Sequence, residues 1–249
     1  MSKGDKLNQF LISSFDESYF YRYGVSWIAS LKEISNFKGV VILVAFDFKN
    51  QKILDILKSN NFLVIQKENV SEKREEVFDI ISDLQDHSEG MYAYFDIDGY
   101  FDDNIQDLYE IDASDYLLVA GDSNMGFCAG KNSSWKFYKD YRKFEKFLNF
   151  NRSLADFVEY NKHVVQIDYV WNCTEPNRIP IGTKAKFVHY SYSVKQTADD
   201  IAEINFSFQK KYPDYFNKWQ NIFFGQVKPA LKNFLFRKKS SEPLSDMGE

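Results

Sequence analysis

Apolar and polar residues alternate along the first half of the chain in a pattern that predicts repeated strand–helix units. Short apolar runs rich in β-branched and aromatic residues are typical of strands, and apolar residues three or four positions apart are typical of helices. The pattern predicts strands at 10–14, 39–46, 62–66 and 91–95, and helices at 17–35, 51–59 and 71–85, with Ser71 as the N-cap of the last helix. Such a series predicts an α/β fold whose mostly parallel central sheet is flanked by helices on both faces.

The second half of the chain is less regular. We expect strands at 116–120, 127–129 and 187–190, and helical segments at 133–150, 156–160 and 198–211. From Tyr212 onward, large aromatic residues are mixed with Lys and Arg, and the end of the chain is polar. We therefore divide the chain into a domain (1–211), a small C-terminal aromatic and basic helical appendage (212–239) and a disordered tail (240–249). The appendage would either pack back onto the domain or contact a membrane surface.

Composition excludes several classes of function. The 249 residues carry a net charge of −5 and no strongly basic core segment, so we expect no nucleic-acid binding. Cys128 and Cys173 are too far apart for a typical zinc-ligand pair, and we interpret both as free thiols in a reducing compartment. No stretch approaches the roughly 18 apolar residues of a membrane span, and the N-terminus lacks the apolar core of a signal peptide. We expect a cytoplasmic protein. Contact of the appendage with the inner face of the membrane is an open alternative.

The segment 94-YFDIDGYFDD-103 is the strongest candidate for chemistry. Asp96 and Asp98 directly follow an expected buried strand, and ligands of such sheets bind beyond the carboxyl ends of the strands. The pair has three interpretations: ligands of a divalent metal that meets a nucleotide diphosphate, the nucleophile and the acid of a phosphatase, or a solvated acidic turn in a protein without enzymatic activity.

The phosphatase interpretation rests on two short motifs. Residues 95–99, Phe-Asp-Ile-Asp-Gly, are similar to the first motif of haloacid-dehalogenase-type phosphatases, and 119-VAGDSNMGFCAG-130 is similar to their magnesium-binding motif. Tyr100 stands where that family has Thr. The interval between Asp98 and Asp122 is also too short to hold the strands, helices and catalytic Lys of that fold, so this is the weaker interpretation.

The metal interpretation gains support from a second motif late in the chain. Asp96-Ile97-Asp98 and 189-HYSYSVK-195 resemble motifs of nucleotide-sugar-dependent glycosyltransferases with the Rossmann-like GT-A fold. The nearest likeness is to the retaining family that includes bacterial lipopolysaccharide galactosyltransferases and glycogenin. This resemblance implies that Asp96, Asp98 and His189 bind Mn²⁺ or Mg²⁺ and that Lys195 contacts the donor diphosphate. Oxygen ligands suit these ions, and the metal stabilises charge as the sugar–phosphate bond breaks.

Further partial matches imply where the nucleotide would bind. In 13-SSFDESY-19, which corresponds to the nucleoside-binding loop of the family, Asp16 would accept a hydrogen bond from the base or the ribose. Tyr19 would stack on the ring. Arg74, at the start of the helix before the aspartate strand, resembles a donor-binding arginine.

Two other matches concern the sugar. Asn124 resembles an asparagine that positions the donor sugar, and Gly126 resembles a glycine that lets the backbone approach the sugar closely. If Asn172 matches a further asparagine of the family, Asp168 falls where a glutamine often lies. An aspartate there would stabilise an oxocarbenium-like centre, act as a nucleophile or act as a general base, so the stereochemical outcome stays open.

Taken together, the resemblance implies a metal-dependent hexosyltransferase and favours a retaining over an inverting reaction. It would transfer a sugar from a nucleotide donor, a UDP-sugar by preference, to a glycan or lipid-linked acceptor in surface polysaccharide assembly. The alternatives are an aspartate-nucleophile phosphatase and a catalytically inactive interaction scaffold of the same fold.

Overall fold

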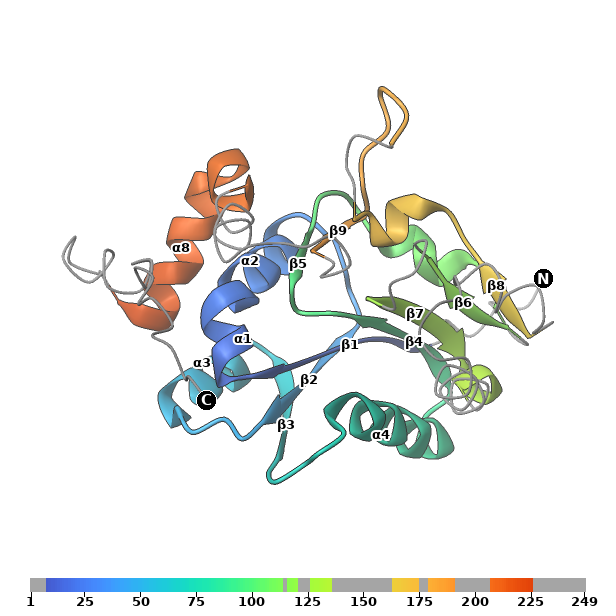
Figure 1. Cartoon of the computed structure of the whole chain (residues 1–249), viewed down its shortest axis with the longest axis horizontal. Helices are drawn as coiled ribbons and strands as arrows, with labels where there is room; N and C mark the ends of the chain where they lie inside the picture. Colours follow the sequence, from blue (N-terminus) through green and yellow to red (C-terminus); the bar gives the residue numbers. More distant parts are fainter. Residues whose placement is uncertain are drawn as a thin grey trace, which may run out of the picture.

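The computed structural model describes residues 8–113, 116–120, 126–135, 163–174, 179–190 and 207–225. These residues form a seven-stranded sheet with helices on both faces, and a separate two-stranded sheet (Figure 1). The large sheet has the strand order β3-β2-β1-β4-β7-β6-β8. Its strands are β1 (Asn8–Asp16), β2 (Val40–Phe46), β3 (Phe62–Lys67), β4 (Gly90–Phe95), β6 (Leu117–Val119), β7 (Phe127–Lys131) and β8 (Val164–Gln166).

Only β7 runs against the direction of the other strands. It is antiparallel to both of its neighbours, β4 and β6, while all other neighbouring strands pair in parallel. The predicted mostly parallel sheet is therefore confirmed. Because β1, β2, β3, β4, β6 and β8 share one direction, their carboxyl ends lie along one edge of the sheet, the edge at which α/β proteins bind ligands.

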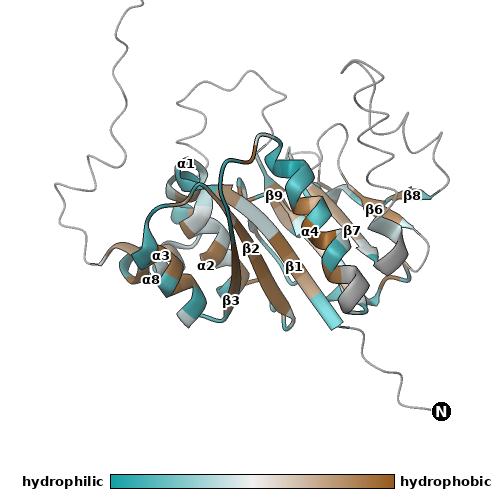
Figure 2. Ribbon diagram, turned by 90° about the horizontal axis from the view of Figure 1, so that it is seen from below, coloured by the Kyte–Doolittle hydropathy of each residue, from teal (hydrophilic) through white to brown (hydrophobic). Residues whose placement is uncertain are grey.

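Both faces of the sheet are covered. Along β4, Met91, Ala93 and Phe95 pack in one core cluster with residues of α2 and α3, while Tyr92 and Tyr94 pack in a second cluster with residues of α4. This alternation follows from the two-residue period of a strand. Figure 2 shows hydrophobic colour along most of β2 and a mixture of both colours along α4, as expected for a buried strand and a covering helix.

The helices largely follow the prediction, with two differences at their beginnings. The expected helix 17–35 consists of three pieces, α1 (Glu17–Tyr19), a π-helical turn η1 (Phe20–Gly24) and α2 (Val25–Glu33). Helix α3 (Gln51–Ser59) has the predicted bounds. Helix α4 (Lys73–His87) has Glu72 at the N-cap with no side-chain cap, so the predicted cap at Ser71 is wrong.

Short 3₁₀ helices are η2 (Gln106–Glu110), η3 (Asn132–Trp135) and η4 (Tyr169–Asn172).

The small sheet joins two distant parts of the chain. Strand β5 (Gly99–Phe101), which the sequence did not predict, pairs antiparallel with β9 (Phe187–His189), and Gly99 lies opposite His189. This pairing brings the later motif next to the residues that follow β4.

Helix α8 (Pro213–Phe224) packs onto α2. Its inward face consists of the buried Phe216, Trp219 and Phe223. Burial of aromatic side chains of this size stabilises the contact by roughly 2–3 kcal/mol each. This part of the predicted appendage therefore packs back onto the domain. In the described part of the chain, no helix combines the length and the apolar character needed to cross a membrane.

Several expectations lie outside the described residues. They are most of the helix expected at 133–150, all of the segment expected at 156–160, and the first part of the helix expected at 198–211, of which residues 207–211 are helical. Asn124, Lys195 and residues 226–249 also lie outside the described residues.

Candidate metal site and adjoining pocket

Asp96 and Asp98 lie at the carboxyl end of β4, in the turn that leads to β5. The Asp96 backbone N–H donates to the carbonyl oxygen of Gly126 over 2.9 Å, which extends the β4–β7 pairing by one step. Asp96 is 9% exposed and Asp98 8% exposed. Carboxylates at this depth need partners, because burying a charge without compensation is costly.

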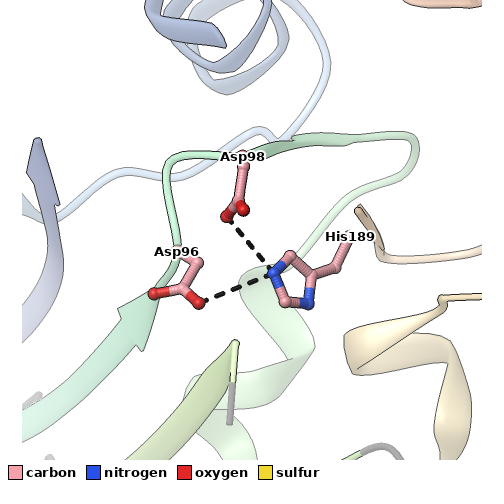
Figure 3. Close-up of side chains that lie close together, drawn as sticks. All are labelled: Asp96, Asp98 and His189. Atoms are coloured by element: carbon pink, nitrogen blue, oxygen red, sulfur yellow. Dashed lines mark hydrogen bonds and ion pairs between the residues drawn. The ribbon is translucent and has the colours of Figure 1, made fainter. Parts of the chain in front are cut away.

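His189 supplies a partner for both aspartates. Its Nε2 lies 3.3 Å from Oδ1 of Asp98 and 3.5 Å from Oδ2 of Asp96 (Figure 3). The backbone holds this arrangement, because Tyr190 N–H donates to the carbonyl oxygen of Asp98 over 3.0 Å and His189 N–H donates to that of Cys173 over 2.9 Å. The structure thus brings together the three residues that the sequence assigned to a metal.

The three side chains fit a divalent cation. One ligand atom from each lies within 4.8 Å of the other two, and the described residues hold no other such group of three. Adjacent ligands of an octahedral ion with bonds of about 2.1 Å stand about 3 Å apart, close to the 3.3 and 3.5 Å between Nε2 of His189 and the two carboxylates. Among the described residues, Nδ1 of His189 is buried without a hydrogen-bond partner, so the polar contacts of the ring are those of Nε2 with the two carboxylates. Two carboxylate oxygens and one imidazole nitrogen are a suitable ligand set for a divalent metal ion.

Gly126 makes room for the histidine. A Cβ added to Gly126 would lie 2.2 Å from Cε1 and 2.3 Å from Nδ1 of His189. The structure shows that the imidazole ring approaches this glycine closely, and the predicted approach of the donor sugar stays a prediction. Glycine at this position is therefore a requirement of the candidate metal site itself.

Both oxygens of Asp96 carry a further partner. The hydroxyl of Tyr94 donates to Oδ1 over 2.5 Å, and Nη2 of Arg74 donates to Oδ2 over 3.0 Å. Burial of Tyr94, together with the charge of Asp96, raises its pKa well above the ordinary value, so its hydroxyl remains a donor. Burial alone would lower the pKa of His189, but the carboxylates of Asp98 and Asp96 outweigh it and the pKa is raised.

A pocket of about 340 Å³ opens beside the cluster. Its lining includes the three metal-site residues together with Asp16, Tyr19, Lys73 and Arg74. Oδ1 of Asp16 accepts from the Tyr19 N–H over 3.0 Å, and its Oδ2 accepts from Nζ of Lys73 over 2.9 Å. Burial would raise the pKa of Asp16, but these hydrogen bonds and the charge of Lys73 outweigh it and lower the pKa.

The sequence missed Lys73, although it lines the same pocket as Arg74. The signal available was its position directly before Arg74, at the start of a helix that precedes the aspartate strand. The contact of Lys73 with Asp16 depends on how α4 packs beside β1, which no local sequence pattern shows.

Two further predicted residues in the described part of the chain, Asp168 and Asn172, do not line this pocket. Asp168 is exposed, follows β8, and its Oδ1 accepts from the Val170 N–H over 3.0 Å. It lies at the same edge of the sheet as Asp96, but three strands away, a separation of roughly 14 Å. Asn172 is buried, and its side-chain amide donates to the carbonyl oxygen of Ala120 over 2.9 Å, which is a structural contact.

The two later aspartates of the acidic run bind lysines instead. Asp102 accepts from Nζ of Lys211 at 2.6 and 2.7 Å and from the hydroxyl of Tyr212 at 2.8 Å. Asp103 pairs with Lys186 at 3.2 Å. The run is thus divided into two residues that face the candidate metal site and two that tie together neighbouring parts of the fold.

The fold and the cluster at the sheet edge define the class: an α/β protein of the GT-A type, the fold found in glycosyltransferases. No family model and no curated protein matches the chain. Solved glycosyltransferase structures do match it.

Two of these structures superpose on most of this chain. The galactosyltransferase LgtC in complex with donor and acceptor sugar analogues has a TM-score of 0.59 and 11% identity, over 90% of this chain and 99% of LgtC. The apo form of the glycosyltransferase GlyE from Streptococcus pneumoniae TIGR4 has a TM-score of 0.59 and 14% identity, over 85% of this chain and 63% of GlyE. The chain thus spans less than two thirds of the GlyE chain. At these identities the likeness establishes the fold.

Proposed function

We propose that this protein is a metal-dependent glycosyltransferase that takes a sugar from a nucleotide-sugar donor, a UDP-sugar by preference. The acceptor would be a glycan or a lipid-linked intermediate in surface polysaccharide assembly. The observation that carries the proposal is the cluster of Asp96, Asp98 and His189 beside an open pocket at the carboxyl edge of a GT-A-type sheet.

The residues around the pocket divide naturally among the parts of such a donor. Asp96, Asp98 and His189 would hold Mn²⁺ or Mg²⁺, which when bound neutralises the diphosphate and favours its departure. Lys73 and Arg74 are the first two residues of α4, where the helix dipole also favours an anion, so they are placed to meet the phosphates. Tyr19 and Asp16 line the part of the pocket near α1, where we place the nucleoside.

Three further contacts with the donor are carried over from the family that the motifs resemble. We keep Asn124 and Asp168 as the residues that face the donor sugar, and Lys195 as a further contact of the diphosphate. Asp168 has an exposed carboxylate at the same edge of the sheet as the metal cluster, which is compatible with a role once donor and acceptor are bound. Because the motifs resemble those of a retaining family, we favour retention of the anomeric configuration over inversion.

Contact with the inner face of a membrane is kept as a separate proposal. The inward face of α8 is used for packing, so such contact would depend on its exposed residues, Tyr215 and Ile222, and on the basic segment that follows. Co-sedimentation with vesicles containing anionic lipid checks this, and recovery of all protein in the supernatant would remove the proposal.

A thermal-shift measurement tests the proposed function. UDP, GDP and simple phosphate esters are each added with and without Mn²⁺. A ligand at a hundred times its dissociation constant adds about 2.7 kcal/mol, a rise of roughly 5–10 °C for a domain of this size. We expect a metal-dependent rise with UDP, lost in Asp98→Asn and retained in Asp103→Asn, which changes a neighbouring carboxylate outside the cluster. A shift with phosphate esters instead would favour a phosphatase, and no shift with any ligand would favour a scaffold.

A further inference from the structure

One oxygen atom of Asp96, Oδ2, lies close to two other side chains. Oδ2 faces Nε2 of His189 at 3.5 Å, so it is the oxygen that a metal between the two residues would use. The same Oδ2 accepts the hydrogen bond from Nη2 of Arg74 at 3.0 Å. Arg74 therefore donates to the same oxygen that a cation at this site would bind, and its positive charge would repel that cation.

We propose that Arg74 is an internal substitute for the divalent cation, and that it exchanges Asp96 for the diphosphate of the donor when metal and donor bind. On this view Arg74 makes the binding of metal and nucleotide diphosphate cooperative. The inference rests on the proposed function and adds to it a mechanism that keeps metal affinity low until a donor arrives.

The two partners of Asp96 differ in their freedom to leave. Tyr94, which holds Oδ1, is 2% exposed and packs against Phe78 of α4. The side chain of Arg74 is 39% exposed and lines the pocket. The buried tyrosine therefore keeps its hydrogen bond to Oδ1, and only the partner of Oδ2 can change. The arginine has space to turn toward a ligand in the pocket.

The charges of the site lead to the same conclusion. With His189 neutral, as metal binding requires, Asp96, Asp98 and Arg74 together leave one negative charge. A divalent cation alone would reverse that sign and place two positive charges beside the guanidinium. A divalent cation that enters with a doubly charged diphosphate leaves the net charge unchanged and gives Arg74 a new anionic partner.

Lys73 provides a matched control for this argument. It is adjacent in sequence, carries the same charge and lines the same pocket, but its partner is Asp16 rather than a residue of the metal cluster. Removing Lys73 changes the electrostatic potential of the pocket without releasing a metal ligand.

Isothermal titration calorimetry of Mn²⁺, with and without UDP, tests the proposal in the full chain. We expect Arg74→Gln to bind Mn²⁺ about tenfold more tightly than the wild type in the absence of nucleotide, within the usual range of coupling between sites. UDP should then improve the affinity for Mn²⁺ by a smaller factor than in the wild type. Lys73→Gln should change Mn²⁺ affinity much less at physiological ionic strength, and Arg74→Lys, which keeps the charge, should retain the weak binding of the wild type.

The outcomes separate this inference from the proposed function. If the wild type binds Mn²⁺ and UDP but Arg74→Gln binds Mn²⁺ no more tightly than Lys73→Gln does, the substitute role is wrong and the glycosyltransferase proposal stands. If the wild type binds neither Mn²⁺ nor UDP, the proposed function fails and this inference fails with it. Arg74→Met is a second neutral variant for the same comparison should Arg74→Gln fail to fold.

Discussion

Gly126 and His189 are in such close contact that no side chain fits between them. A Cβ on Gly126 would lie 2.2 Å from Cε1 of the ring, well inside van der Waals contact. The same glycine accepts the backbone hydrogen bond of Asp96, so one residue supports two of the three candidate metal ligands.

Substitution of Gly126 by Ala should therefore displace the His189 ring. We expect a loss of about 1–3 kcal/mol in the free energy of unfolding, the usual cost of overpacking, together with loss of Mn²⁺ binding. A double-mutant cycle with His189→Ala checks the cause by urea denaturation. The cost of the alanine should largely disappear when the ring is absent, and an equal cost in both backgrounds would show that the clash is not with His189.

Tyr94 should act as a positioning residue for Asp96. Its hydroxyl holds Oδ1 and so orients Oδ2 toward His189. We expect Tyr94→Phe to weaken Mn²⁺ binding by about 10- to 100-fold, as loss of an outer hydrogen bond to a metal ligand does, measured by calorimetry.

Tyr92→Phe is the matched control for Tyr94→Phe. Tyr92 lies on the same strand and face, and its hydroxyl donates to the backbone oxygen of Ser88 over 2.8 Å, away from the metal cluster. Both variants should lose some stability, but only Tyr94→Phe should lose metal affinity. Equal metal affinities for the two variants would remove the positioning role.

The four leading strands could be predicted because each contains a short apolar run followed by polar or turn residues. The position of Asp96 and Asp98 at a strand end followed from that alone. In contrast, β5 is three residues long and pairs with β9, which follows much later in the chain, so neither its existence nor its register is visible in a local pattern. The link between His189 and the aspartates came from the resemblance of motifs rather than from periodicity.

The sequence also did not predict which residues the charged side chains pair with. Lys73, Lys186 and Lys211 each bind an aspartate of a different segment. In sequence all three are ordinary solvated lysines, and only the packing of α4, β9 and residues 207–212 brings them to their carboxylates. The roles of Asn124, Lys195 and Asp168 stay predictions.

Glu33 should make the docking of α8 dependent on pH. Its Oε1 accepts from Lys218 at 2.7 Å and from the indole N–H of Trp219 at 2.9 Å. Burial alone would raise the pKa of Glu33, but these two partners outweigh it and lower the pKa below the ordinary value of 4.5. Because the pKa is lowered in the folded state, the stabilisation is complete above the unfolded pKa and is lost as the pH falls through the folded pKa.

We therefore expect Glu33→Gln to lower the free energy of unfolding by up to about 1 kcal/mol at neutral pH, since Lys218 is largely exposed and the pair is screened by solvent. The difference between wild type and variant should shrink once the pH falls below 4.5. Urea denaturation at several pH values measures it. A difference that is independent of pH would mean that the lost hydrogen-bond geometry, rather than the charge, accounts for the effect.

Asp102 should link the candidate metal site to the C-terminal part of the described chain. Its carboxylate is buried at the end of β5 and holds both Lys211 and Tyr212, directly before α8. Removing one partner of such a pair leaves the others without compensation, although the exposed lysine can regain water. We expect Asp102→Ala to lower the free energy of unfolding by about 2–3 kcal/mol.

The measurement for Asp102 combines stability with metal binding. Strand β5 places Gly99 opposite His189, so a loosened β5 should also weaken Mn²⁺ binding. Lys211→Met leaves the buried Asp102 carboxylate with Tyr212 as its remaining partner among the described residues, so it should also lower the free energy of unfolding. Because Asp102 stays in place at the end of β5, we expect this variant to keep a metal affinity close to that of the wild type. If Asp102→Ala lowers stability but binds Mn²⁺ as tightly as the wild type, the contacts of Asp102 stabilise only the packing of α8. The pairing of β5 with β9 would then not depend on Asp102.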